Sequence, residues 1–221
     1  MVDRAAKSAL YDALAEAAKA LGSGRRAELV DILAQGERSV EELALEIDQS
    51  TANTSQHLQR LLRAGLVRTR REGTRIYYAL AGPGVATLWQ ALRRTAEEHV
   101  HGLQQLAEDY IGDRTGLDTM TKDQLRARLR TGDVVVLDVR PATEYEAGHI
   151  RGAVSLPISD LRARLQDIDS TTLVVAYCRG PYCVYADEAV RLLNAAGRNA
   201  ARLDEGFPEW AAARLPVARG A

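Results

Sequence analysis

The spacing of apolar residues changes once along this chain, and that change constrains the fold more than any other feature. Over roughly the first hundred residues, apolar side chains such as Leu10, Leu14 and Leu21 recur at helical spacing. From residue 120 onward, continuous apolar runs such as "DVVVLDV" and "TLVVAYC" alternate with helical segments. Buried strands separated by helices are typical of a parallel sheet covered on both faces. The pattern therefore predicts two domains of different class.

We expect a mainly helical domain over residues 1–110, a linker over 111–119 and an α/β domain with a central parallel sheet over 120–221. A chain of 221 residues is long enough for two small domains, each with a core. Its net charge of −1 means that nucleic-acid binding would need a local basic patch. Apolar runs long enough to span a membrane are absent, and charges interrupt the N-terminal segment, so we expect no membrane partner and a cytoplasmic location.

The helical half contains several signals for the beginning and end of elements. Ser39 followed by Glu42 is a capping-box pattern for a short third helix, and "TANTSQHLQRLLRAGLV" predicts a fourth. The stretch "LVRTRREGTRIYYAL" alternates apolar and polar residues around Glu72-Gly73, which predicts a hairpin. One long helix is expected over about residues 85–110. Helices followed by a hairpin in this order form the winged helix-turn-helix arrangement.

The fourth helix and the hairpin carry residue types that contact DNA. Side chains of Ser, Thr, Asn, Gln and Arg bond base edges and phosphates, and a basic hairpin can lie along a phosphate backbone. The candidate DNA-binding residues are Ser50, Thr51, Asn53, Thr54, Ser55, Gln56, His57, Arg60, Arg70, Arg71, Thr74 and Arg75. Composition alone leaves a solvated helix beside a charged hairpin as an equal alternative.

The stretch "STANTSQHLQRLLRAGLVRTRREGTRIYYAL" resembles the ArsR (arsenic-repressor-like) family of bacterial winged-helix regulators, and the resemblance covers about residues 5–108. It implies a homodimer built from the first and last helices of the domain. Two reading helices would then enter successive major grooves of double-stranded operator DNA, about 34 Å apart. The resemblance also implies repression that is released when a signal changes the dimer.

Many members of that family sense metals, but the sequence does not favour a metal site. The third helix, "VEELALEI", lacks the cysteines that one family site uses. His99 and His101 are two residues apart, which places them on different faces of a helix, and no set of partners follows. His57 lies in the reading helix, where phosphate contact or packing is the better interpretation. We therefore expect neither a metal nor a cofactor.

The only two cysteines, Cys178 and Cys183, lie in the loop "CRGPYC" between a buried strand and a helix. Backbone N–H groups, the positive end of the helix and the adjacent Arg179 can lower the pKa of the Cys178 thiol. The same groups can hold the negative terminal sulfur of a persulfide. Because the cytosol keeps thiols reduced, the pair is expected to be reactive and not structural. Two cysteines without other ligands make a poor zinc site.

Residues 120–216 resemble a single-domain rhodanese, a sulfurtransferase fold, through "LDVRPATEYEAGHIRGAVSLP", "AYCRGPYC" and, more loosely, "LDEGFPEW". The six-residue loop has the length that goes with sulfur substrates, whereas related phosphatases use a loop one residue longer. The resemblance implies that Cys178 accepts sulfane sulfur from a donor such as thiosulfate, a persulfide or a polysulfide. It also implies that the substrate cradle consists of Arg179, Gly180, Pro181, Tyr182 and Cys183. Asp138 and Arg140 would brace the floor of the site, or form an ordinary buried ion pair.

Cys183 departs from many rhodanese loops, which carry Ser, Thr or a basic residue at that place. A second thiol there could attack a persulfide or sulfenic acid on Cys178 and leave a disulfide or polysulfide bridge. Alternatively, Cys183 packs at the helix start. The sequence thus predicts a DNA-binding regulator, expected to be a repressor, that senses reactive sulfur or redox state. A sulfurtransferase with an accessory DNA-binding domain, and an idle loop that responds to peroxide, remain alternatives.

Overall fold

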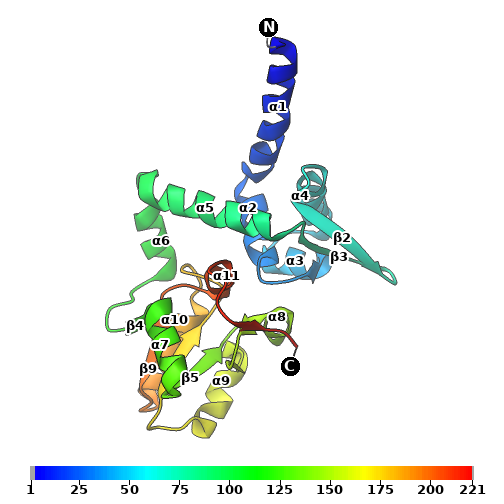
Figure 1. The fold of residues 1–221 in the computed structure, drawn as a ribbon. Coiled ribbons are helices and arrows are strands. Elements are labelled where there is room, and N and C mark those ends of the chain that lie inside the picture. The colour runs from blue at the N-terminus through cyan, green and yellow to red at the C-terminus, as the bar shows by residue number, and fades with distance from the viewer. Residues whose placement is uncertain (1–2, 221) are drawn as a thin grey trace. The chain divides into compact units, whose positions relative to one another are not determined.

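The computed structural model describes residues 3–220, which form two compact units (Figure 1). One unit extends to Arg93 and the other begins at Arg94, so the division falls within helix α5 (Pro83–His99). Each unit has its own buried apolar core, as the change in periodicity predicts. No described helix is long and apolar enough to cross a membrane.

The first unit has the winged helix-turn-helix arrangement predicted from the sequence. Its elements are α1 (Arg4–Leu21), α2 (Gly24–Leu33), β1 (Arg38–Ser39), α3 (Val40–Glu46), α4 (Thr51–Arg63), β2 (Val67–Glu72), β3 (Arg75–Leu80) and the beginning of α5. Strands β2 and β3 pair antiparallel with Glu72 opposite Arg75, and β1 pairs with β3. The predicted capping box of α3 is confirmed, because Ser39 and Glu42 each accept a hydrogen bond from the other's backbone N–H.

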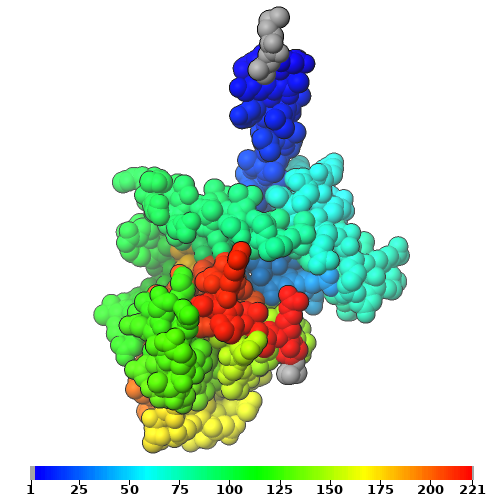
Figure 2. Space-filling model, in the orientation of Figure 1, coloured from blue at the N-terminus to red at the C-terminus, as the bar shows by residue number. Residues whose placement is uncertain are grey.

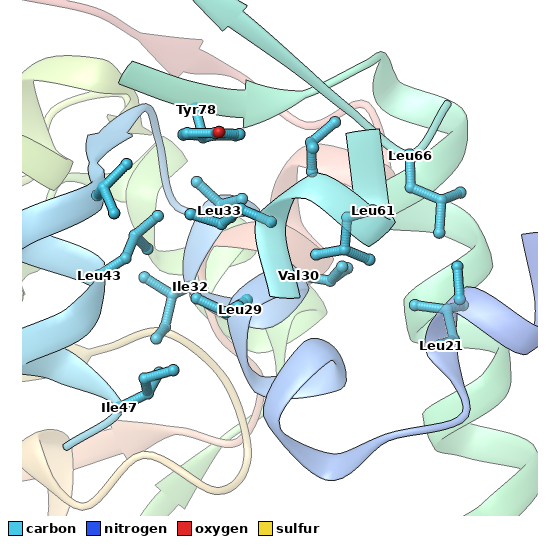
Figure 3. Packing of buried hydrophobic residues seen from close by; sticks show 14 residues of the cluster. Leu21, Leu29, Val30, Ile32, Leu33, Leu43, Ile47, Leu61, Leu66 and Tyr78 are labelled. Atoms are coloured by element: carbon cyan, nitrogen blue, oxygen red, sulfur yellow. The ribbon is translucent and has the colours of Figure 1, made fainter. Parts of the chain in front are cut away.

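The core of the first unit fixes the position of α4, the predicted reading helix (Figure 3). Leu29 of α2, Leu43 of α3 and Leu61 of α4 are fully buried and lie in one apolar cluster. Tyr78 of β3 closes this cluster, and its hydroxyl accepts a hydrogen bond from Gln59 at 3.1 Å. Burial of each leucine contributes about 1.5–3 kcal/mol. The inward face of α4 is therefore held by packing, which directs its other face to solvent.

The single long helix expected over residues 85–110 is interrupted, so that prediction is wrong. Helix α5 ends at His99, and a separate helix α6 spans Leu103–Ile111. Gly102 precedes α6 with φ 82°, a left-handed conformation that glycine adopts without steric penalty. The apolar spacing continues across the break, which explains why the pattern alone predicts one helix.

The second unit is built on a five-stranded parallel sheet of order β4-β9-β8-β5-β7, which confirms the predicted α/β class. After the C-terminal part of α5 and helix α6, its elements are β4 (Thr119–Met120), α7 (Lys122–Thr131), β5 (Val134–Asp138), α8 (Ala142–Ala147), β6 (His149–Ile150), β7 (Val154–Ser155), α9 (Ile158–Arg164), the 3₁₀ helix η1 (Leu165–Asp167), β8 (Leu173–Tyr177), α10 (Tyr185–Ala195), β9 (Ala200–Leu203), α11 (Phe207–Ala212) and β10 (Val217–Ala218). Strands β6 and β10 form a separate antiparallel pair.

Helices cover both faces of this sheet. Leu161 of α9 and Leu193 of α10 pack on one face, while Leu125 of α7 and Trp210 of α11 pack on the other. Strand β8 is central, between β9 and β5, and it is buried from Val174 to Tyr177. Because neighbouring parallel strands end at the same edge of a sheet, residues that follow β5, β8 and β9 can meet there.

Candidate functional site

The sulfur loop, residues 178–183, leaves the carboxyl end of β8 and leads into α10. The sulfurs of Cys178 and Cys183 are bonded, and the two Cα atoms are 6.2 Å apart. Cys183 donates its backbone N–H to the Gly180 carbonyl at 3.1 Å, which closes the turn between the cysteines. Cys178 is only 2% exposed because it directly follows the buried strand β8. This geometry allows direct exchange between the two sulfurs, while the chemical role of each cysteine remains a prediction.

The segment before α11 lies directly against this loop. A Cβ atom at Gly206 would be 2.3 Å from the Gly180 amide nitrogen and 2.4 Å from the Arg179 carbonyl carbon. The next residue, Phe207, donates its backbone N–H to the Cys178 carbonyl at 3.1 Å. Only glycine permits this approach of two backbones. Gly206 belongs to the motif "LDEGFPEW", but the sequence does not predict that it contacts the sulfur loop.

Arg179 is bound to a buried carboxylate that sequence reasoning missed. Its Nε lies 3.0 and 3.1 Å from the two oxygens of Glu144, and a terminal nitrogen lies 2.5 Å from Oε1. The Glu144 side chain on α8 is fully buried and that of Arg179 is 14% exposed. Such a fork-shaped ion pair holds the first turn of the loop. Because Glu144 offsets its charge, Arg179 is not the free cation that the sequence suggested beside Cys178.

Asp138 and Arg140 form a fully buried ion pair that extends to the residue before Cys178. Arg140 binds both carboxylate oxygens of Asp138 and donates to the Gly148 carbonyl at 2.8 Å. Tyr177 donates its hydroxyl to Asp138 at 2.5 Å. Burial and the charge of Asp138 raise the pKa of Tyr177, so this hydroxyl keeps its proton. The pair therefore contacts the end of β8, as a bracing role requires.

The predicted DNA-binding residues differ in their accessibility. Exposed positions on α4 and on the β2–β3 hairpin are Thr51, Asn53, Gln56, Arg60, Arg70, Arg71, Thr74 and Arg75. Ser55 is partly buried, and Ser50 caps α4 by accepting a hydrogen bond from the Asn53 N–H at 3.2 Å. Arg70 is paired with Glu37 and Glu72, so part of its charge is already offset.

Thr54 cannot face a DNA groove, and its assignment as a DNA-binding residue is wrong. Its side chain is fully buried, and its hydroxyl donates to the Ser50 carbonyl at 3.0 Å. Thr54, Leu58 and Leu61 lie on the same helix face, which points into the core.

His57 is half-buried on α4, and its Nδ1 finds no hydrogen-bond partner among the described residues. Burial and then the charges of Arg26 and Arg60 lower the pKa of His57. A neutral, half-buried ring fits packing better than phosphate contact.

Two family models match this chain in the same order as its two units. The model described as "Bacterial regulatory protein, arsR family" matches residues 23–69. The model described as "Rhodanese-like domain" matches residues 121–213. These two matches confirm both family resemblances that the motifs indicated.

Individual proteins similar to this chain include transcriptional regulators. The HTH-type transcriptional regulator Rv0324 of Mycobacterium tuberculosis is 46% identical over 215 residues, which are 97% of this chain and 94% of that protein. The Biofilm growth-associated repressor of Agrobacterium fabrum is 45% identical over 74 residues, 34% of this chain and 63% of that protein. Among solved structures, the homodimeric winged helix-turn-helix DNA-binding domain Mb0332 from Mycobacterium bovis is 46% identical, covers 46% of this chain and 92% of that chain, and has a TM-score of 0.43. The chain therefore belongs to the ArsR family of bacterial regulatory proteins, as a transcriptional regulator that also carries a rhodanese-like domain.

Proposed function

We propose that this regulator senses reactive sulfur or redox state through Cys178 and Cys183, and that the state of this pair sets its affinity for operator DNA. One observation carries the proposal. The two cysteines of the chain are within bonding distance of each other, in a loop at the carboxyl end of the central strand. A loop of this kind can pass between a dithiol, a persulfide and a disulfide without rearrangement of the sheet behind it.

The reaction with sulfur has two steps. The Cys178 thiolate attacks the outer sulfur of a persulfide or polysulfide donor; the donor's sulfur–sulfur bond breaks and the donor leaves as a thiolate. Cys178 then carries a persulfide. The Cys183 thiol attacks the inner sulfur of that persulfide and expels its outer sulfur as hydrogen sulfide, which takes up both remaining protons. The product is the Cys178–Cys183 disulfide.

Peroxide leads to the same bond by another route. The Cys178 thiolate attacks hydrogen peroxide, forms a sulfenic acid and releases hydroxide. The Cys183 thiol then displaces the sulfenic hydroxyl as water, and the disulfide forms. The two signals therefore differ in the intermediate on Cys178, although they share the final product.

We propose that the protein binds DNA as a homodimer whose interface includes α1. Leu10, Tyr11 and Leu14 on this helix are 59%, 61% and 62% exposed. Figure 2 shows α1, in blue, standing clear of the remainder of its unit over most of its length. Exposed apolar side chains grouped in this way mark an interaction surface. The occupant we propose is α1 of a second copy, and the cytosol, where the DNA lies, is the proposed location.

The proposed sign of regulation is repression, which the family resemblance and the printed name of the Agrobacterium relative favour. A signal shifts operator occupancy only if the two states of the loop bind DNA with different affinity. About 1.4 kcal/mol of difference corresponds to a tenfold change in Kd.

A gel-shift titration tests the proposal directly. The probe is a duplex selected from random-sequence DNA by the dithiothreitol-reduced full-length protein, titrated with untreated, polysulfide-treated and peroxide-treated protein. We expect treatment to change Kd by about tenfold or more in the wild type and not in Cys178→Ser. Equal affinity in every state of the wild type would sink the sensor proposal.

Mass spectrometry separates the two signals. Polysulfide is expected to add about 32 mass units for each sulfur retained on Cys183→Ser, whose Cys178 persulfide cannot be resolved. Peroxide is expected to add oxygen to that variant instead. The wild type should lose about two mass units relative to its dithiol form with either reagent.

The rhodanese-like match over residues 121–213 also supports a sulfurtransferase as a second candidate function. A transferase would move sulfur from thiosulfate to an acceptor with many turnovers. That activity would be lost in Cys178→Ser and retained when Arg71 and Arg75 are replaced. Turnover without any effect of sulfur on Kd would favour this alternative.

A further inference from the structure

One side chain of the segment expected as the linker binds the sulfur loop. Arg114 donates from Nε to Asp187 Oδ2 at 2.7 Å, and from a terminal nitrogen to the Pro181 carbonyl at 2.9 Å. Pro181 lies between the two cysteines, and Asp187 lies in the first turn of α10. A single guanidinium thus connects the segment between α6 and β4, the sulfur loop and the helix that follows the loop.

The carboxylate that holds Arg114 is fixed within the unit. Asp187 is fully buried, and Arg202 of β9 lies 2.8 Å from its other oxygen. A buried carboxylate between two guanidiniums has little freedom to move, because separation from either would leave a charge without compensation. Arg114, with 27% of its side chain exposed, is therefore anchored on a rigid support.

Other contacts hold the segment around Arg114 against α10 and the loop against the end of α5. Arg191 of α10 donates to the Asp113 carbonyl at 2.5 Å, and Leu117 packs against the core beneath α10. On the loop itself, the Tyr182 hydroxyl donates to Glu97 near the end of α5 at 2.6 Å. Asp113 is thus bound to α10 and Leu117 packs beneath it, while the described contact from this segment to the loop backbone is made by Arg114.

We propose that Arg114 is a positioning residue that couples the bonded state of Cys178 and Cys183 to the segment between α6 and β4; the inference rests on the proposed function. The sulfur–sulfur bond closes a ring that restricts residues 179–182 and keeps the Pro181 carbonyl within reach of Arg114. A dithiol reductant breaks that bond: two thiols form on the protein, and the reductant becomes a disulfide. The opened loop has more conformations available, so the Pro181 carbonyl leaves Arg114 while Asp187 retains it.

Coupling between two sites is reciprocal. If Arg114 binds the loop better in the disulfide than in the dithiol, the disulfide must become easier to reduce when this contact is removed. A side chain that merely supports the fold would not shift that equilibrium. The thiol–disulfide equilibrium therefore gives a readout independent of DNA.

The first experiment uses Arg114→Gln, which loses the charge, and Arg114→Lys, which keeps an ion pair with Asp187 but cannot also span the distance to Pro181. Arg126→Gln is the control, because Arg126 is an exposed arginine on α7 and its replacement changes the net charge equally. Full-length proteins are equilibrated in buffers of reduced and oxidised glutathione. Their free thiols are then alkylated, and mass spectrometry measures the fraction of protein in the disulfide form. We expect the equilibrium constant for formation of the Cys178–Cys183 disulfide to fall about fivefold in both Arg114 variants. The same constant should stay unchanged in Arg126→Gln.

The second experiment measures Kd of the dithiol and disulfide forms for the selected duplex. In Arg114→Lys the Kd values of the dithiol and disulfide forms should differ by about twofold or less. In Arg126→Gln they should differ as much as in the wild type. A wild-type ratio of one contradicts the proposed function itself. A clear wild-type ratio that persists in Arg114→Lys, or an unshifted disulfide equilibrium in that variant, overturns the role of Arg114 alone.

Discussion

Replacement of Gly206 by alanine changes the sulfur loop without touching either cysteine. The added methyl would lie 2.3 Å from the Gly180 amide nitrogen, 2.6 Å from the Gly180 Cα and 2.4 Å from the Arg179 carbonyl carbon. All three atoms belong to the backbone, so no side-chain rotation can relieve the overlap. The two segments must separate by about 1 Å to restore ordinary van der Waals distances.

This separation has two energetic consequences. Overpacking of a tight contact destabilises a protein by about 1–3 kcal/mol. Movement of the segment also weakens the hydrogen bond from Phe207 to the Cys178 carbonyl, which contributes about 0.5–1.5 kcal/mol. We therefore expect Gly206→Ala to lower the free energy of unfolding of the second unit by about 2–4 kcal/mol. Formation of the Cys178–Cys183 bond should also become slower, because the loop no longer lies against a fixed surface.

The assay is urea denaturation followed by tryptophan fluorescence. In a Trp89→Phe background, Trp210 is the remaining tryptophan of the chain, and it reports on the second unit because it is 1% exposed there. Gly84→Ala is the control, since no atom lies within 4 Å of a Cβ at that position of α5. An unchanged midpoint and an unchanged rate of disulfide formation in Gly206→Ala would refute the close approach on which this reasoning depends.

Three further predictions concern the first unit. Joint replacement of Arg71 and Arg75 by alanine should weaken DNA binding and reduce the slope of log affinity against log salt by about 1.8, measured by fluorescence anisotropy; an unaltered slope would place the hairpin away from the phosphates. Leu14→Asp should convert the dimer to a monomer in analytical ultracentrifugation, and a persisting dimer would exclude α1 as the interface. Burial and nearby arginines lower the pKa of His57, so the unfolded chain binds a proton at this histidine more readily than the folded unit does. The free energy of unfolding of the first unit should therefore be highest above pH 6.5 and decrease as the pH falls below 6.5. His57→Gln should flatten that decline in denaturation followed by Trp89, and an equally steep decline in the variant would count against the assignment.

Features that depend on a few neighbouring residues could be predicted from the sequence. The capping box of α3 depends on Ser39 and Glu42, three residues apart, and the structure contains it. The parallel sheet follows from continuous apolar strands separated by helices, since both faces of such strands must be covered. The order of helices and strands then restricts each of the two units to few fold classes.

Thr54 and Gly102 show where a local pattern gives two answers. A threonine in a reading helix has the right chemistry for a groove, yet Thr54 shares its helix face with Leu58 and Leu61, and burial of that face decides its orientation. A glycine within helical spacing is tolerated in many helices, yet Gly102 takes a positive φ and separates α5 from α6. For Thr54 the surrounding fold is decisive, because burial of its helix face fixes its orientation.

The residues that support the sulfur loop could not be predicted, because each acts across a long separation in sequence. Glu144 and Arg179 are 35 residues apart, and Arg114 and Asp187 are 73 apart. The chain has 29 basic and 30 acidic residues, so composition offers many pairings of equal merit. The fold selects these pairs: Glu144 and Arg179 follow strands β5 and β8, which end at one edge of the sheet, whereas Arg114 reaches Asp187 from the segment before β4.

The two arginines that the described structure places on the loop, Arg179 and Arg114, each bind a fully buried carboxylate. Their charges are therefore largely offset and contribute little attraction for an anionic donor or a Cys178 thiolate. Activation of that thiol is left to backbone N–H groups and the beginning of α10, where Asp187 and Glu188 also lie. The loop's arginines thus fix its shape more than its charge, which supports the proposed sensor over a transferase that must attract and bind a dianion such as thiosulfate.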